Sequence, residues 1–89
     1  MEEVIKQAFE DIESFLLGTY DPMDFSFDFP AKMVYNKKVW LANETLLDAL
    51  NEVPSVCADY DDDYPLEKFK ERVRVEYEKA KAIYEQEKH

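Results

Sequence analysis

Residues 65–84 read PLEKFKERVRVEYEKAKAIY, and this stretch decides the fold class. Its apolar side chains recur at steps of three and four over five turns, which places them on one face of an α-helix. Pro65 suits the first position of a helix, where no intrahelical hydrogen bond from its nitrogen is needed. Four acidic and basic pairs three residues apart support the exposed face. The stretch predicts a long amphipathic helix whose core face is formed by Leu66, Phe69, Val73, Tyr77, Ala80 and Tyr84.

Two helices are predicted in the first third of the chain. Apolar residues with helical spacing cover residues 3–17, and Gly18 is placed to end this helix as the residue after its C-cap. Asp21 and Pro22 are typical of an N-cap and a first helical position, so a second helix begins near Pro22.

The body of the second helix carries conflicting signals. Phe25, Phe27 and Phe29 alternate as they would in a strand, and Pro30 removes a backbone donor and disfavours helix at the residue before it. We expect a helix that kinks or restarts at Pro30 and runs to about Tyr35.

Asn36 and Asn43 are both possible N-caps for a third helix, whose apolar residues favour an end before Pro54. A further short helical turn is expected over residues 55–60. Adjacent like charges oppose regular structure, so residues 59–63 are expected to form a loop.

These elements predict an all-α fold, a small antiparallel four-helix bundle, with residues 1–89 as a single helical domain. An all-β fold is improbable because the chain has one glycine, and hairpins and bulges need glycine. A hydrophobic fraction of 46% argues against disorder. One cysteine, Cys57, excludes an internal disulfide, and its apolar neighbours predict a buried thiol.

The net charge of −10 is concentrated in residues 1–63, which carry 15 acidic residues and four lysines, a net of −11. Solubility alone would explain this excess, whereas the functional interpretation is electrostatic steering of a basic partner. Direct binding of nucleic acid is disfavoured because phosphate recognition needs clustered lysine and arginine. The acidic N-terminus and the lack of a long apolar run predict a soluble, cytoplasmic protein without a membrane partner.

An enzyme is the least favoured class. The only histidine, His89, is the last residue of the sequence, where nothing fixes its geometry against a nucleophile. A calcium loop starting at Asp59 would have Tyr64 where glycine is required and Lys70 where the bidentate glutamate belongs. The single glycine excludes a glycine-rich phosphate loop. We therefore expect no catalytic residues, no cofactor and no metal.

Aromatic residues gather around Pro30, and the phenylalanines among them are expected to fill the core. The aromatic residues of this group are Phe25, Phe27, Phe29, Tyr35 and Trp40. Tyr60 and Tyr64 flank the acidic run and are harder to place in a core. Because interface hot spots favour tyrosine beside charge, both are candidates for contact with a partner.

Four segments carry a resemblance to a known family: FLL at residues 15–17, DFS at 24–26, NETLLDALNE at 43–52 and FKERV at 69–73. In length, order and acidity the chain resembles the small bacteriocin immunity proteins of the colicin D immunity type. The resemblance implies a helical bundle that binds a basic, tRNA-cleaving toxin domain and places acidic side chains where substrate phosphates would lie. The positions that carry over are Glu52, Asp59, Asp61, Asp62 and Asp63.

Two functional hypotheses follow. In the first, the chain is an immunity or inhibitor protein whose acidic surface neutralises a basic cognate toxin domain. In the second, it is a small adaptor or regulatory bundle that receives a partner helix in an apolar groove around Trp40 and Phe29.

Overall fold

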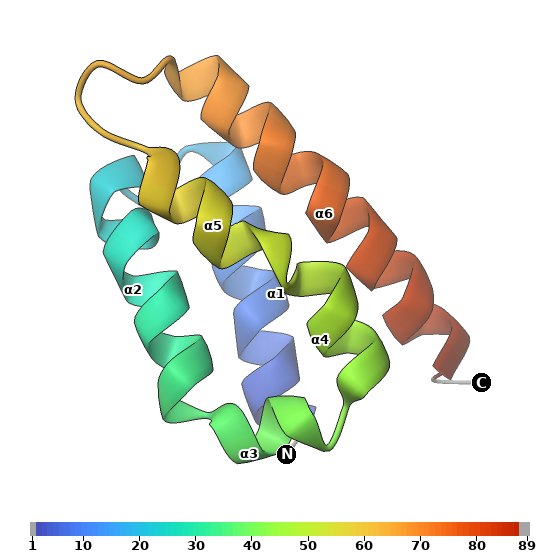
Figure 1. Ribbon diagram of the computed structural model, residues 1–89. Helices are drawn as coiled ribbons and strands as arrows, with labels where there is room; N and C mark the ends of the chain where they lie inside the picture. Colours follow the sequence, from blue (N-terminus) through green and yellow to red (C-terminus); the bar gives the residue numbers. More distant parts are fainter. Residues whose placement is uncertain (1, 88–89) are drawn as a thin grey trace.

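Six α-helices make up residues 2–87, the part of the chain that the computed structural model describes, and these residues contain no strand (Figure 1). The helices are α1 (Glu2–Leu17), α2 (Pro22–Tyr35), α3 (Lys37–Leu41), α4 (Glu44–Leu50), α5 (Glu52–Asp59) and α6 (Leu66–Glu87). They enclose one contiguous hydrophobic core, and the radius of gyration is 12.4 Å. The all-α prediction is confirmed, with six helices where four were expected. None of the described helices combines the length and the apolar character needed to cross a membrane.

The end of α1 is as predicted. Gly18 has a φ of +88°, a left-handed conformation that glycine adopts without a steric penalty. Its N–H donates to the Phe15 carbonyl at 3.1 Å, and the Thr19 N–H donates to the Ser14 carbonyl at 2.9 Å. This pair of hydrogen bonds is the Schellman arrangement, which satisfies two carbonyl groups at the end of the helix.

The start of α2 also matches the sequence signal. The Asp21 carboxylate accepts hydrogen bonds from the backbone N–H groups of Met23 (3.0 Å) and Asp24 (3.1 Å). Of the two expected alternatives at Pro30 the restart is wrong, because α2 continues through the proline, and the predicted end at about Tyr35 is confirmed. The buried side chains of α2 lie on both sides of the proline, so packing against the core holds the two halves in one helix.

Replacing Asp21 with alanine should lower the free energy of unfolding by about 1 kcal/mol, because two N–H groups lose their acceptor. Urea unfolding of Asp21→Ala measures this loss. The control is Asp62→Ala, which removes an exposed loop carboxylate. Equal effects of the two substitutions would contradict the capping role of Asp21.

The single third helix predicted to end before Pro54 is wrong, because the chain forms α3 and α4 and begins α5 before that proline. The further helical turn expected over residues 55–60 is present as the second half of α5. The side-chain amides of Asn36 and Asn43 donate to the carbonyls of Lys32 (3.0 Å) and Val39 (2.8 Å). They therefore close the turn that precedes them rather than cap the N-terminus that follows. Pro54 does not mark a helix end but lies in the first turn of α5, where a missing N–H is tolerated.

The long helix α6 confirms the prediction from residues 65–84. Phe69, Val73 and Ala80 are completely buried and Tyr77 is nearly so, whereas Leu66 and Tyr84 are half-buried. Figure 1 shows α6 (orange to red) passing along α5 and α4, and it also packs on α1. Two of the four expected charge pairs form, at 3.0 Å for Glu71–Arg74 and 3.5 Å for Glu76–Lys79.

The aromatic residues around Pro30 divide into two groups. Phe25 and Phe29 are buried, as predicted, and Trp40 is buried as well. Phe27 is 69% exposed, so the prediction that it fills the core is wrong, and Tyr35 is 89% exposed. Residues 25 and 29 are one helical turn apart, while residue 27 lies on the opposite side of the helix.

Cys57 is buried in α5, as expected from its apolar neighbours. Burial raises the pKa of the Cys57 thiol to about 12. The thiolate form that nucleophilic chemistry requires is therefore disfavoured at neutral pH.

Candidate protein-binding site

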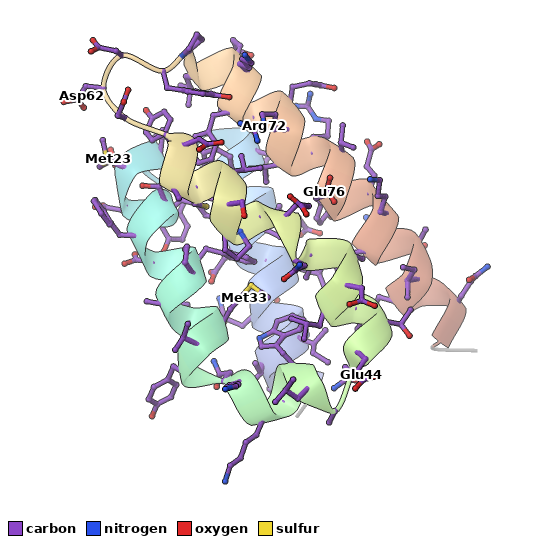
Figure 2. All side chains as sticks on the ribbon, in the orientation of Figure 1. Met23, Met33, Glu44, Asp62, Arg72 and Glu76 are labelled. Atoms are coloured by element: carbon purple, nitrogen blue, oxygen red, sulfur yellow. The ribbon has the colours of Figure 1, made fainter. Side chains whose placement is uncertain are left out.

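The acidic run lies where the sequence placed it, in the connection between α5 and α6. Asp59 is the last residue of α5, and Asp61, Asp62 and Asp63 are exposed in the loop that follows. Figure 1 shows this loop projecting from the end of the molecule where α2 begins, and Figure 2 shows the Asp62 side chain pointing away from the helices. The three loop carboxylates are therefore open to a partner.

Hydrogen bonds within the loop set its shape. The Asp61 carboxylate accepts from the Asp63 N–H at 2.9 Å, and the Tyr64 N–H donates to the Asp61 carbonyl at 3.1 Å. An aspartate that bonds the backbone two residues ahead forms an Asx-turn. The adjacent carboxylates are thus carried on a turn that forms without a partner.

The two tyrosines that flank the acids anchor the loop to α6. The Tyr60 ring stacks on Phe69 with centroids 4.4 Å apart, so Tyr60, which the sequence made hard to place in a core, is partly buried and packs against the core. The Arg72 guanidinium donates to the Tyr64 hydroxyl at 2.9 Å and to Asp59 at 3.1 Å. The pKa of Arg72 is raised, mainly by the hydrogen bond to Tyr64 and to a smaller extent by the hydrogen bond to Asp59. Both tyrosines are half-buried, and their first role in the structure is to position the loop.

Glu52 does not join the other acidic candidates. It was expected at the end of a third helix beside the loop, but it is the first residue of α5. Asp59 ends the same helix seven residues later, about 10 Å away along the helix axis at 1.5 Å per residue. The break at Asn51, which the sequence did not reveal, separates Glu52 from the acidic loop.

The start of α2 adds carboxylates that sequence reasoning missed. Asp21, Asp24 and Asp28 are exposed, and Asp28 accepts a hydrogen bond from the Tyr20 hydroxyl at 2.7 Å. The pKa of Tyr20 is raised, mainly by partial burial of its hydroxyl and to a smaller extent by this hydrogen bond to Asp28. Figure 2 shows Met23, within this segment, at the same end of the molecule as Asp62.

Aromatic packing joins these two acidic segments. The Phe69 ring lies 4.4 Å from Tyr60, which precedes the loop, and 6.2 Å from Phe25 in the first turns of α2, measured between centroids. The helices α2 and α5 also pack on each other. The cap signal at Asp21 was visible in the sequence, but only the tertiary packing brings it near the loop.

A second feature is an apolar groove between α1, α2 and α3, with a volume of about 320 Å³. Its wall includes Phe29, Met33 and Trp40, and Figure 2 shows Met33 directed from α2 toward the interior. At its edge the buried Asp11 carboxylate accepts hydrogen bonds from the Lys32 ammonium group (2.9 Å) and from the Gln7 side-chain amide (2.9 Å). The groove thus lies where the sequence placed a possible helix-binding site.

Residues 2–87 contain no group of three or more histidine, cysteine, aspartate or glutamate side chains arranged to hold a metal ion. His89 lies outside the described residues.

No protein-family model, curated protein or solved structure matches this chain. The likeness to immunity proteins therefore rests on the four sequence segments at residues 15–17, 24–26, 43–52 and 69–73.

Proposed function

We propose that this protein is an immunity protein that binds a basic toxin nuclease domain, of bacteriocin or contact-dependent type, and neutralises it without catalysis. The observation that carries the proposal is the exposed, pre-shaped acidic loop at residues 61–63. We further propose that the fold is a small antiparallel four-helix bundle like that of the colicin D immunity type. In this bundle α3, α4 and α5 together occupy the place of one helix.

The local ion pairs support a role in binding. Among the described residues, Asp59 is the only acid of the run that forms an ion pair, at 3.1 Å from Arg72. Asp61, Asp62 and Asp63 project their charge into solvent, where mutual repulsion opposes the compact state. A basic active-site groove would relieve that repulsion and offer arginine or lysine donors to each carboxylate.

The internal contacts of the loop support the same function. An interface that is already ordered loses little conformational entropy on binding, so more of the contact energy appears as affinity. The turn at Asp61 and the packing of Tyr60 on Phe69 supply that order. The net charge of −11 over residues 1–63 would also speed the approach of a basic domain.

A second candidate function is favoured by the apolar groove. In this alternative the chain is an adaptor, its acidity serves solubility, and a partner helix inserts large apolar side chains beside Trp40 and Phe29. A volume of about 320 Å³ is at the lower limit of small-molecule pockets and suits one or two side chains of a helix.

Salt separates the two candidates. The experiment measures the association rate of the protein with the basic C-terminal domain encoded by the neighbouring gene, between about 0.01 M and about 0.15 M ionic strength. An immunity protein should lose about tenfold or more in association rate, whereas a groove binder should be nearly indifferent.

Ala8→Leu provides the matched variant for this experiment, because Ala8 lines the groove and lies far from the loop in the sequence. Binding that survives Ala8→Leu and falls with salt supports the immunity function. Binding that is lost in Ala8→Leu and is insensitive to salt supports the adaptor.

A further inference from the structure

The side of α2 that faces away from the core is unusually apolar. Phe27, Val34 and Tyr35 are 69%, 75% and 89% exposed, and Ala31 between them is exposed as well. Three of the six large apolar side chains that are exposed in the described chain therefore lie on this one helix. Solvent-facing apolar residues concentrated on one helix mark an interaction surface more often than scattered ones do.

The spacing on this side of α2 follows a coiled-coil seam. Phe27, Ala31 and Val34 are separated by steps of four and three, and Asp24 continues the pattern toward the start of α2. Ala31 is small enough to let a second helix approach closely at the middle of the seam. We call Asp24, Phe27, Ala31, Val34 and Tyr35 the outer face of α2.

The charges on the outer face are opposite at its two ends. Asp24 and Asp28 are exposed toward its start, and Lys37 and Lys38 are exposed at the start of α3, directly after Asn36, which ends α2. Although residues 1–63 contain only four lysines, two of them are at this one place. A surface that is acidic at one end, apolar in the middle and basic at the other is complementary to itself after a twofold rotation.

We propose that the outer face of α2 is a docking surface for a second copy of this chain, with the two α2 helices antiparallel about a twofold axis near Ala31. In this arrangement Asp24 and Asp28 of each copy lie near Lys37 and Lys38 of the other. Phe27 and Val34 of both copies fill the centre. The proposal needs no toxin and leaves the function of the acidic loop as a separate question.

A small contact area and repulsion between like-charged copies both limit the strength of this dimer. The seam occupies about three turns of helix, so the contact is smaller than the roughly 800 Å² per partner of a standard interface and the dimer is weak. Each copy carries a net charge of −10, so the copies repel each other at long range. Because salt screens long-range repulsion more than close pairs, dimerisation should strengthen from low to physiological salt. The dimer should thus strengthen as salt rises to the physiological concentration, whereas binding to a basic toxin domain should weaken.

The test is sedimentation of the full chain at concentrations from about 1 µM to about 1 mM at physiological salt. The wild type should show a reversible monomer–dimer equilibrium. Ala31→Glu, which puts like charges across the axis, should weaken association at least about tenfold. The control is Val75→Glu on α6, which alters an exposed apolar residue elsewhere and should leave the equilibrium unchanged. All these positions are solvent-facing, so thermal melting should confirm that each variant folds.

A charge exchange tests the antiparallel arrangement. Replacing both Asp24 and Asp28 with lysine should weaken the dimer, and so should replacing both Lys37 and Lys38 with glutamate. A variant that combines all four substitutions should recover a dimerisation affinity within about threefold of the wild type. A wild type that stays monomeric throughout the concentration series would overturn the proposal. So would a dimer that Ala31→Glu leaves intact, or a combined variant that is weaker than either parent.

Discussion

Phe69→Ala should lower the free energy of unfolding by about 3 to 5 kcal/mol, the largest effect on stability that we expect from one substitution. The Phe69 ring is completely buried. Its centroid lies 4.8 Å from that of Phe15, 6.2 Å from Phe25 and 4.4 Å from Tyr60. Truncation would leave a cavity where α1, α2, the acidic loop and α6 meet. Because small domains are stable by only about 5 to 15 kcal/mol, this variant could be largely unfolded.

Phe27→Ala is the matched control, since it removes the same side chain from a position that is 69% exposed. Its free energy of unfolding should change by no more than about 0.5 kcal/mol. Urea unfolding followed by circular dichroism measures both variants. An unchanged midpoint for Phe69→Ala, or equal shifts for the two variants, would show that the core has been assigned to the wrong face of α6.

The helices at the two ends of the chain could be predicted because their signals are local. Apolar spacing alone located α6, and Gly18 and Asp21 marked the boundary between α1 and α2 through hydrogen bonds to residues within one turn. Such signals depend on neighbours in the sequence, so no knowledge of the tertiary structure was needed.

The middle of the chain could not be predicted because its signals are ambiguous. Asparagine closes a preceding turn as readily as it caps a following helix, and the structure uses Asn36 and Asn43 in the first way. Pro54 is compatible with either a helix end or a helix start. Phe27 could not be separated from Phe25 and Phe29 until the period of that segment was known to be helical.

The candidate site could be predicted only in part. A run of adjacent aspartates identified the loop, since charge density is a property of the sequence. The packing of Tyr60 on Phe69 and the separation of Glu52 from Asp59 depend on which elements meet in space. The position of Asp21 and Asp24 at the same end of the molecule as the acidic loop also depends on tertiary packing.

Replacing Asp59, Asp61, Asp62 and Asp63 with asparagine should leave stability nearly unchanged while reducing binding to the basic toxin domain. The change relieves repulsion between adjacent acids and removes one exposed ion pair with Arg72, and each of these effects is small. Asparagine retains an acceptor for the turn at position 61. In the complex, by contrast, removing one member of a desolvated charge pair costs about 2 to 5 kcal/mol.

The contributions within the loop should be unequal. We expect the largest losses at Asp61 and Asp63, which are exposed and lie between the anchored rings of Tyr60 and Tyr64. Asp59 should matter less because Arg72 already pairs with it. Glu52, expected from the sequence to contribute, now lies at the far end of α5, and Glu52→Gln should have little effect on binding.

A matched control separates the local effect of the loop from the effect of total charge. Replacing Glu44, Asp48, Glu78 and Glu85 with their amides also removes four negative charges, so both variants change the net charge from −10 to −6. All four control residues are exposed and lie outside the loop. This variant should lose association rate but keep most of its affinity at physiological salt.

The most direct test of the proposed function is the affinity of three proteins for the basic domain encoded by the neighbouring gene, measured by calorimetry at physiological salt. These are the wild type, the fourfold loop variant and the fourfold control variant. We predict tight binding by the wild type and the control, and a loss of at least about thirtyfold for the loop variant, corresponding to about 2 kcal/mol. Equal affinities for all three proteins would contradict the proposal that the acidic loop is the toxin-binding surface.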